Sequence, residues 1–555
     1  MNESITLYYN GKIFTADDER PSAQAMIVKG RRILWAGDDA DADAALAEEA
    51  AGPAARVDLG GRRVLPGFID NHMHPVTQAQ FSQQISVLPP AINSIEEMIS
   101  AIREAREAMD EGIAASDPAS CWIQGWGYNE GKFAEKRSTS RYDLDRGAGD
   151  VPVSIVRSCQ HIRVVNSKAL EICGIDADTP DPVGGEIDRD EQGEPTGILR
   201  ENARLLVPPF IPEPDARESA SMITHLGELL ASQGITAIAE LGSLDGTDNY
   251  ELYRESIRQG LKQDIAMYYM WDSVRDDSRF TITKEQMAEG QQLRVCGLKI
   301  LGDGSVSGHT AWMEEPYPGT DDYGVSTCTD DLLESAVAFC REHRCQLALH
   351  AMGRKTIRRF VDRLAGEEPW TEGDVPYVRL EHVTDPAPET IHKAAEAGIA
   401  WSTQPLFVFS EIESYLDNLG HEWTKRCYPV RSILEAGLPL SLSTDAPSTA
   451  WAVPYDPILN IRSAVTRRAY DGTDFGQEER IDIRTALRLY TSEAAKMIGL
   501  HDLGRIAPGF RASFIVLDED ILKFDQNTPA EEWDRVHVGE TYINGECVYK
   551  RSESI

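Results

Sequence analysis

Between residues 235 and 447, short apolar segments alternate with amphipathic helical segments along the chain. Apolar runs of this length fit strands that are buried on both faces, as in a parallel sheet with crossover helices. Eight such strands, separated mostly by helical segments such as TDDLLESAVAFCREH, predict an α/β fold of the (β/α)8 TIM-barrel class. The predicted strands are VLPGFID at 64–70, then 235–241, 265–271, 296–304, 346–353, 377–383, 399–405 and 438–447.

The two ends of the chain carry a different pattern, in which short strands flank tight turns. ITLYY and KIFTA flank Asn10-Gly11, a dipeptide that favours a type I′ hairpin turn. Near the other end, TYI and ECVYK flank a second such pair, Asn544-Gly545. We therefore predict that residues 1–63 and 500–555 build one small β-sandwich beside a barrel domain at 64–499.

Residues 76–220 do not follow the βα repeat. They combine a helical pattern, SIEEMISAIREAREAMDEG, with turn-rich segments such as PDPVGGEIDRDEQGEP. A long insertion after the first barrel strand is the simplest explanation of this stretch. Because loops at that end of the strands surround the mouth of a barrel, we predict that the insertion covers the active-site mouth.

Composition narrows the class of protein. Apolar residues make up 41% of the chain and charged residues 26%, which is typical of a globular protein. A net charge of -36 argues against nucleic acid and anionic membranes as partners. Nine cysteines without a C-x-x-C pair argue against a disulfide framework and favour a reducing cytoplasm, and no export signal is recognisable. We expect a cytoplasmic homo-oligomer, a dimer, that acts on a small molecule.

Histidines, a lysine and an aspartate fall where the predicted strands end. A His-x-His pair on a strand places both imidazoles on one face, where they can share a metal ion, although an isolated pair of this kind is as often two surface histidines. Barrel enzymes keep their chemistry at the C-terminal ends of the strands. The residues at these ends are His72, His74, Lys299, His350, His382 and Asp445.

Each of these residues has an ordinary structural explanation when it is taken alone. His350 and His382 resemble core histidines, and Asp445 resembles a helix cap. Lys299, inside the apolar strand CGLKILGDG, is harder to explain, because a buried lysine needs a partner. His350 and His382 lie 32 residues apart and Asp445 follows 63 residues later, which matches one and then two βα units. Together the residues predict a metal centre.

Imidazole and carboxylate ligands suit zinc, with manganese, cobalt, iron or nickel as substitutes. A metal ion makes bound water a nucleophile at neutral pH and polarises the carbonyl under attack. Asp445 is expected to take the water's proton and pass it to the leaving nitrogen.

Several motifs resemble the amidohydrolase superfamily: PGFIDNHMHP, the lysine of the fourth strand, LALHAMG, RLEHV, LSTDAP and the closing segment GRIAPGFRASFIVLD. The long insertion and the GDGS run after Lys299 resemble the subgroup that contains N-substituted formamide deformylases. The resemblance implies two metal ions, with Lys299 as a carbamylated bridge and Asp445 as ligand and general base. It assigns one ion to His72 and His74 and the other to His350 and His382.

Two departures from the subgroup concern the substrate. GSVSGHTAWM stands where GSLGSRTA is common, so His309 replaces a basic position and favours a smaller or uncharged substrate group. QHIRVVNSKAL departs from the frequent DGH and leaves His161 as a pocket candidate. Aromatic residues near a barrel mouth are explained by packing as well as by recognition. The predicted substrate-binding residues are Trp126, Tyr128, His161, Glu201, His309, Trp312 and Phe407.

We therefore predict a metal-dependent hydrolase of a carbon–nitrogen bond other than a peptide bond, with a small N-substituted formamide as the favoured substrate. The same site would also suit a carbamate, an ester, a cyclic amide or a heterocycle that is deaminated. A non-catalytic binding barrel is the alternative from another class, and purified protein without bound metal would favour it.

Overall fold

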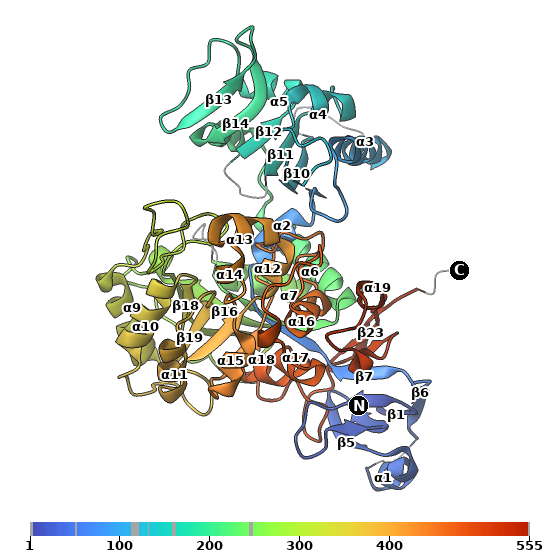
Figure 1. Cartoon of the computed structure of the whole chain (residues 1–555). Coiled ribbons are helices and arrows are strands. Elements are labelled where there is room, and N and C mark those ends of the chain that lie inside the picture. The colour runs from blue at the N-terminus through green and yellow to red at the C-terminus, as the bar shows by residue number, and fades with distance from the viewer. Residues whose placement is uncertain are drawn as a thin grey trace. The chain divides into compact units, whose positions relative to one another are not determined.

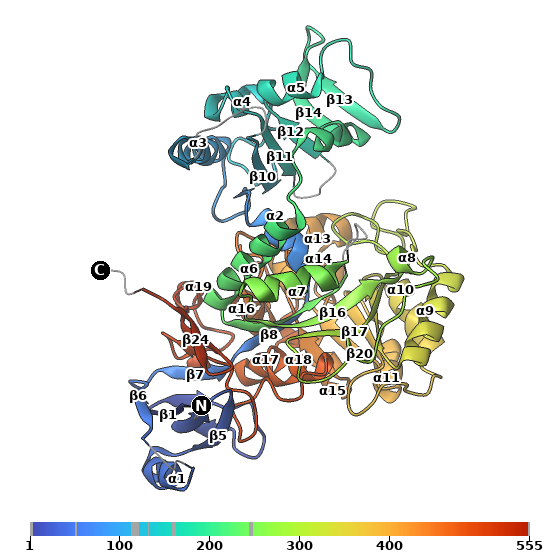
Figure 2. The same ribbon diagram turned by 180° about the vertical axis from the view of Figure 1, so that it is seen from behind.

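The structure, a computed structural model, describes residues 4–49, 53–112, 121–130, 132–157, 162–242 and 248–552. The chain forms two compact units. Unit 1 comprises Met1–Pro75, Ile223–Thr449 and Tyr455–Ile555, and unit 2 comprises Val76–Met222 and Ala450–Pro454. Figures 1 and 2 show the elements of both units from opposite sides.

Unit 1 contains an eight-stranded parallel sheet in the order β21-β20-β19-β18-β17-β16-β15-β8, with helices packed on its outside (Figures 1 and 2). This arrangement confirms the predicted (β/α)8 barrel. Alanines of its strands, such as Ala237, Ala266 and Ala348, belong to one buried hydrophobic cluster with Tyr268. The strands are β8 (Phe68–Met73), β15 (Ile235–Glu240), β16 (Asp264–Met270), β17 (Leu293–Leu301), β18 (Gln346–Ala351), β19 (Val378–His382), β20 (Ala400–Thr403) and β21 (Leu440–Leu442).

The helices between these strands begin where the sequence offers capping residues. In α9, for example, the Thr329 side chain accepts a hydrogen bond from the backbone N–H of Leu332, and α11 begins at Pro388. The longer helices of the unit are α1 (Ala42–Glu49), α6 (Ala216–Ser232), whose residues before Ile223 belong to unit 2, α7 (Asn249–Gln259), α9 (Asp330–His343), α10 (Arg354–Leu364), α11 (Pro388–Glu396), α13 (Ile412–Leu419), α16 (Pro457–Thr466) and α17 (Ile483–Leu489). Shorter ones are α8 (Trp271–Val274), α12 (Leu406–Ser410), α14 (His421–Thr424), α15 (Val430–Glu435), α18 (Ser492–Met497) and α19 (Ala530–Trp533).

The sheet closes between β21 and β8 through the loop that follows β21. The backbone N–H of Asp445 donates to the carbonyl of His72 at 2.8 Å, and the N–H of His74 donates to the carbonyl of Ala446 at 2.7 Å. The hydroxyl and the N–H of Thr444 both donate to the buried Asp70 carboxylate, at 2.5 and 3.1 Å. Closure therefore happens at the end of the barrel where the histidines lie.

The segment VLPGFID, predicted as one strand, is divided between two sheets. β7 (Arg63–Pro66) pairs with β22 (Phe514–Leu517) in the terminal sheet, whereas β8 pairs with β15 in the barrel. Gly67 connects β7 to β8. The chain passes so close to Thr236 that a Cβ at position 67 would lie 2.3 Å from the Thr236 side chain, which explains why this position is a glycine. One residue, Gly67, thus separates the strand that carries His72 from the terminal domain.

Both chain ends contribute to the terminal β-sandwich, as predicted. One sheet has the order β5-β4-β1-β6 and the other β24-β23-β22-β7-β2-β3. The remaining bounds are β1 (Ile5–Tyr9), β2 (Lys12–Phe14), β3 (Ser22–Ala23), β4 (Ala25–Lys29), β5 (Arg32–Gly37), β6 (Ala55–Asp58), β23 (Val538–Ile543) and β24 (Glu546–Lys550).

The two Asn-Gly pairs of this domain behave differently. Asn544-Gly545 joins the paired strands β23 and β24 with both residues at positive φ, 52° and 78°, as a type I′ turn requires. The hairpin predicted at Asn10-Gly11 is wrong, since β1 and β2 lie in different sheets. Asn10 has φ 57°, but Gly11 is absent from the residues of positive φ, so the chain crosses between sheets instead of reversing.

Unit 2 is built on a mixed sheet of order β13-β14-β12-β11-β10-β9, covered on one face by α3 and α4. The turn-rich segment predicted from the sequence forms the β13–β14 hairpin, which sequence reasoning did not identify. That this insertion covers the mouth of the barrel stays a prediction. The bounds are α2 (Pro75–Phe81), β9 (Ile85–Ser86), α3 (Ile95–Gly112), β10 (Ile123–Tyr128), α4 (Arg141–Gly147), β11 (Val153–Arg157), β12 (Ile162–Val165), α5 (Ser167–Cys173), β13 (Gly185–Arg189) and β14 (Pro195–Glu201).

Candidate metal centre

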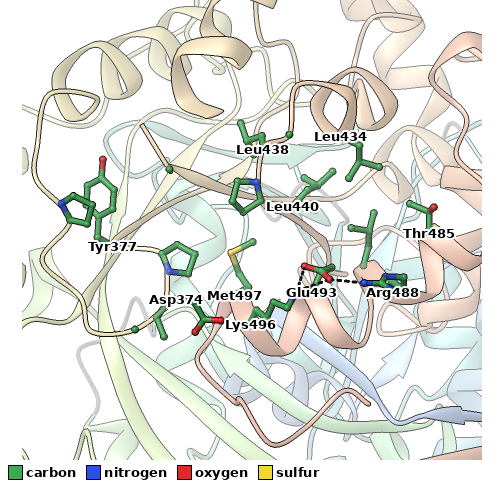
Figure 3. A pocket seen from close by; sticks show the side chains of 18 residues that line it. Asp374, Tyr377, Leu434, Leu438, Leu440, Thr485, Arg488, Glu493, Lys496 and Met497 are labelled. Atoms are coloured by element: carbon green, nitrogen blue, oxygen red, sulfur yellow. Dashed lines mark hydrogen bonds and ion pairs between the residues drawn. The ribbon is translucent and has the colours of Figure 1, made fainter. Parts of the chain in front are cut away.

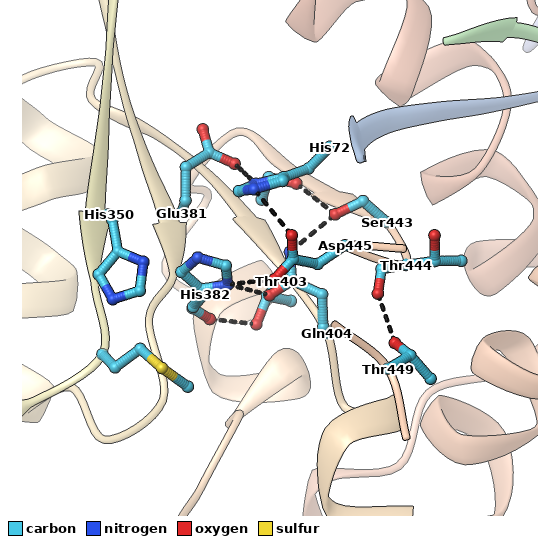
Figure 4. A network of polar contacts seen from close by, with 12 residues as sticks. His72, His350, Glu381, His382, Thr403, Gln404, Ser443, Thr444, Asp445 and Thr449 are labelled. Carbon is cyan, nitrogen blue, oxygen red and sulfur yellow. Dashed lines mark hydrogen bonds and ion pairs between the residues drawn. The ribbon is translucent and has the colours of Figure 1, made fainter. Parts of the chain in front are cut away.

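His72, His74 and Asp445 meet where β8 and the loop after β21 come together. Figure 4 shows His72 and Asp445 of this group. Nε2 of His72 and Nε2 of His74 each lie 3.3 Å from Oδ1 of Asp445. The His72 side chain is fully buried, and that of His74 is 27% exposed. The period-two spacing on the strand thus brings both imidazoles to one carboxylate oxygen.

The outer nitrogens of these two imidazoles are held by acceptors. Nδ1 of His72 lies 2.5 Å from the Glu381 carboxylate, and Nδ1 of His74 lies 3.1 Å from the carbonyl oxygen of Gly242. Because both partners only accept hydrogen bonds, Nδ1 carries a proton in each ring, and Nε2 is the nitrogen left to bind a metal ion or a further proton. Histidines that bind metals are oriented in this way in proteins.

The structure allows a direct test of whether a metal ion fits here. Nε2 of His72 and Oδ1 of Asp445 are buried, and although they lie 3.3 Å apart, neither atom forms a hydrogen bond of proper geometry. A buried acceptor that lacks a partner is costly unless something else satisfies it. Among the described residues, His72, His74 and Asp445 form a group whose donor atoms all lie within 4.8 Å of one another. Two imidazole nitrogens and a carboxylate oxygen are a ligand set that suits zinc.

The charges around this group favour a cation. Although burial lowers the pKa of His74, its interactions with Asp445 and Glu240 outweigh burial and raise that pKa to about 10. Burial raises the pKa of Asp445, but the adjacent His72 and His74 hold it well below its usual range. The carboxylates therefore stabilise positive charge between them, either as a proton on His74 or as a metal ion in its place.

His350 and His382 form the other half of the predicted centre. Their ring centroids lie 4.5 Å apart, and the ring of His382 lies 4.8 Å from that of His72. Nδ1 of His382 contacts Oε1 of Gln404 at 2.9 Å, and Nε2 of His350 contacts the Gly304 carbonyl at 3.0 Å. Each ring therefore has one nitrogen engaged and the other available as a ligand.

This half of the centre carries less negative charge. Burial, followed by the charge of Lys299, lowers the pKa of His350 to about 4. Burial, followed by the charge of His350, holds the pKa of His382 well below its usual range. The two imidazoles are neutral at pH 7, which is the form that binds metals. A carboxylate lies near each ring: Oδ1 of Asp303 is 3.4 Å from Nε2 of His350, and Oδ2 of Asp445 is 4.0 Å from Nδ1 of His382.

Lys299 lies on β17 with only 1% of its surface exposed. No hydrogen bond or ion pair joins its ammonium group to any described residue. Burial lowers the pKa of Lys299 to about 8, although the charges of Glu381 and Asp445 oppose this effect. A lysine with a lowered pKa has a larger fraction of neutral amine at pH 7, the form that carbamylation requires.

The backbone is strained where the centre is assembled. His382, Val383 and Asp445 have φ of 72°, 52° and 57°, in a region that residues other than glycine rarely adopt. Such conformations persist where surrounding structure imposes them, and they concentrate at functional sites. They turn the ends of β19 and of the segment after β21 so that the two side chains meet.

The predicted substrate-binding residues are divided between the two units. Trp126, Tyr128 and Glu201 belong to unit 2. Trp126 stacks on Phe81 at 4.5 Å, and Tyr128 packs in the core of that unit with 1% of its surface exposed. His161 lies outside the described residues. The assignment of these four residues to a substrate pocket stays a prediction.

His309, Trp312 and Phe407 belong to unit 1. The Phe407 ring stacks on the metal-centre imidazole of His382 at 6.0 Å and 22°. His309 stacks on Tyr317 at 4.4 Å, and Trp312 lies under the ammonium group of Lys355 at 4.4 Å. Of the three, Phe407 therefore has a direct contact with a residue of the centre.

Sequence reasoning missed several buried polar residues that support the centre. Glu381 holds His72, Gln404 holds His382, and Asp303 accepts hydrogen bonds from the backbone N–H groups of Trp312, Met352 and Gly353 at 2.8 to 3.0 Å. One signal was available. Glu381 is a charged residue in the apolar strand RLEHV, so the argument applied to Lys299 would also have selected it.

A separate pocket of about 710 Å³ lies at the opposite end of the barrel (Figure 3). Tyr377, Gly398 and Leu440, which line it, stand at the starts of β19, β20 and β21. Leucine side chains form much of its wall, and the charged residues Arg488, Glu493 and Lys496 lie at one side. None of the predicted site residues lines this pocket.

No helix in the described part of the chain is both long enough and apolar enough to cross a bilayer. Comparison with known proteins gives a match of residues 55–549 to the model of the amidohydrolase family. The chain is 27% identical to the N-substituted formamide deformylase of Arthrobacter pascens, over 98% of both chains. It is also 27% identical to the protein LONG AFTER FAR-RED 3 of Arabidopsis thaliana, over 98% of this chain and 91% of that one.

Among solved structures, an uncharacterized metal-dependent hydrolase from Pyrococcus furiosus superimposes with a TM-score of 0.70 at 26% identity. The superposition covers 93% of this chain and all of the other.

Proposed function

Because this chain belongs to the amidohydrolase family, it is a metal-dependent hydrolase of carbon–nitrogen bonds other than peptide bonds, and we propose that it hydrolyses a small N-substituted formamide. The observation that carries the proposal is the group of His72, His74 and Asp445, in which Nε2 of His72 and Oδ1 of Asp445 are buried without a hydrogen-bond partner. A purely structural cluster would satisfy these atoms within the protein.

His72, His74 and Asp445 would hold one zinc ion, and His350, His382 and a carbamylated Lys299 would complete a two-metal centre. When bound, the metal supplies a Lewis acid that polarises a carbonyl group and makes water a nucleophile near neutral pH. Glu381 and Gly242 keep the imidazoles of His72 and His74 in the tautomer that leaves Nε2 free.

Asp445 is the group that we propose moves the proton. Its pKa lies well below the usual range, so the carboxylate is ionised at neutral pH and can accept a proton from the attacking water. The same proton then passes to the nitrogen of the substrate as the carbon–nitrogen bond breaks. The products are the free amine and formate, which together contain the atoms of the formamide and one water.

Two observations support a formamide among small amides. The relative from Arthrobacter pascens, which is named for this activity, matches the chain along nearly its whole length. In addition, the buried Phe407 ring stands against His382 and places an apolar side chain beside the centre, which suits a small uncharged acyl group such as formyl.

A pair of substrates that differ by one methyl group tests the proposal. We expect N-butylformamide to be hydrolysed with a kcat/KM at least about tenfold higher than N-butylacetamide, since an unaccommodated methyl group changes discrimination by 10- to 200-fold. Amine release is the measurement. A carbamate and a cyclic imide are assayed beside them, and faster turnover of either would reject the formamide assignment while leaving the hydrolase class intact.

A further inference from the structure

A chain of buried side-chain hydrogen bonds ends on His382. Oε1 of Gln404 contacts Nδ1 of His382 at 2.9 Å, and Nε2 of Gln404 donates to the Ser443 hydroxyl at 2.8 Å. The Ser443 hydroxyl contacts that of Ser402 at 2.9 Å, and Ser402 donates to Oδ1 of Asn71 at 2.8 Å. Apart from His382, which is 2% exposed, every member of this chain is completely buried.

The chain has a fixed direction. Ser402 has one hydroxyl proton, and the amide oxygen of Asn71 takes it. Ser443 must therefore donate to Ser402, which leaves the Ser443 oxygen as an acceptor for the Gln404 amide nitrogen. The Gln404 amide oxygen then faces His382 and requires a proton on its Nδ1. Nε2 of His382 is left with its lone pair.

The same asparagine reaches His72 through its backbone. Arg379 donates to the carbonyl of Asn71 at 2.9 Å and to the Glu381 carboxylate at 2.5 and 2.9 Å. Glu381 in turn holds Nδ1 of His72 at 2.5 Å. Asn71, a residue of the closing strand β8, thus joins the supports of the imidazoles of His72 and His382, whose ring centroids lie 4.8 Å apart.

We propose that Gln404 is a positioning residue that fixes the tautomer and orientation of His382 for metal binding, as the last member of the hydrogen-bond chain that begins at Asn71. The inference rests on the proposed function, since His382 is a metal ligand only there. A neutral amide acts on His382 where a carboxylate acts on His72, so the two imidazoles differ as ligands.

Gln346 provides a matched control for a buried glutamine. It lies at the start of β18, 1% exposed, and accepts a hydrogen bond from the Tyr268 hydroxyl at 2.5 Å. Its amide nitrogen donates to the carbonyls of Pro376 and Met497. His350 follows four residues later on the same strand, about 13 Å away at the usual rise. Loss of Gln346 removes three side-chain hydrogen bonds, against two for Gln404, and none of the three involves a histidine.

The experiment measures zinc affinity of metal-depleted protein by competition with a chromophoric chelator, resolving each ion bound per chain. Three variants are compared with the unchanged protein: Gln404→Met, Gln404→Glu and Gln346→Met. Methionine keeps the volume of Gln404 and removes its acceptor, whereas glutamate keeps an acceptor for Nδ1 of His382. Thermal unfolding of each metal-free variant reports the purely structural effect.

We expect Gln404→Met to weaken one zinc-binding step by 10- to 100-fold, the range found when partners of ligating histidines are removed. Gln404→Glu should restore most of that loss, and Gln346→Met should lower the unfolding temperature without changing zinc affinity. Zinc affinity of Gln404→Met equal to that of Gln346→Met would overturn the inference, and so would equal losses in Gln404→Met and Gln404→Glu. Both results leave the proposed function standing, whereas failure of the unchanged protein to bind zinc overturns both proposals.

Discussion

The two ends of the barrel differ in how their polar groups are satisfied. At the pocket end, Lys496 and Arg488 share Glu493, at 3.0 and 3.5 Å, and Arg488 also pairs with Asp18. At the other end, Nε2 of His72 and Oδ1 of Asp445 are buried without partners. The pocket end has the volume of a ligand site, but the closing end of the barrel has the unsatisfied chemistry. A group of possible metal-ligand atoms that includes buried atoms without a partner therefore identifies the site better than cavity size does.

Removal of metal should have the largest effect on activity, and this effect should come from the end of the barrel where the histidines lie. We expect dialysis against a chelator to abolish hydrolysis and added zinc to restore it, because the partnerless atoms of His72 and Asp445 lie at the metal end. Amine release before and after reconstitution is the measurement. Full turnover by metal-free protein would contradict the site assignment.

The second-largest difference in activity is expected when one aspartate at each end of the barrel is substituted. Asp445→Asn should lower kcat by about 10²- to 10⁴-fold, since the amide cannot accept the proton of the attacking water. Asp374→Asn is the control, because Asp374 lines the pocket and pairs with His501 at 3.3 Å, away from the histidines of the centre. Steady-state kinetics give kcat for both variants. Equal losses of kcat would show that the two ends of the barrel do not differ in their role in the reaction.

The pH dependence of metal binding should show a smaller effect, specific to the metal end. In the metal-free protein the pKa of His74 is raised to about 10, so the ring carries a proton between pH 7 and 9. Zinc must displace that proton, and its apparent affinity should rise about tenfold per pH unit over this range. The protonated ring stabilises the metal-free fold fully below pH about 6.5, and this stabilisation is lost as the pH rises through about 10.

Chelator competition at pH 7, 8 and 9 measures this slope. Glu240→Gln is the matched variant, because Glu240 is one of the carboxylates that raise the pKa of His74. The slope should be shallower in that variant. A zinc affinity that does not change between pH 7 and 9 in the unchanged protein would show that His74 binds no exchangeable proton there.

The smallest effect is expected at the pocket. Lys496→Met should change the free energy of unfolding by less than about 1 kcal/mol, because Lys496 is 40% exposed and Glu493 retains Arg488 as a partner. Zinc affinity and kcat should stay unchanged. Chemical denaturation and kinetics check both expectations, and a loss of activity would give the pocket end a functional role.

Much of the centre could be predicted from the sequence because its residues fall at the ends of regular strands. His72 and His74 follow from period-two alternation, and His350 and His382 follow from the repeat length of βα units. Gln404 could not be predicted in this way. Its role depends on hydrogen bonds to Ser443 and His382, which lie 39 and 22 residues away, and no local pattern reports such a contact.

The two Asn-Gly pairs show the same limit in the fold. Asn544-Gly545 and Asn10-Gly11 have identical local chemistry, yet only the first closes a hairpin. The pairing of β2 with β7, a segment about fifty residues further along the chain, takes the chain after Asn10 into a different sheet. Tertiary pairing overrides a turn preference because several ladder hydrogen bonds outweigh one favourable dipeptide.

The sequence by itself determined the barrel, the terminal sandwich and which residues stand at the strand ends, because hydrophobic periodicity and strand spacing are local properties. Only the tertiary structure decided which atoms of those residues face one another. Asp445 meets His72 and His74 because the loop after β21 closes the barrel against β8, and the free nitrogens of the imidazoles are selected by partners from four other segments of the chain. Nε2 of His72 and Oδ1 of Asp445 become buried without hydrogen-bond partners only after the strands have closed the barrel.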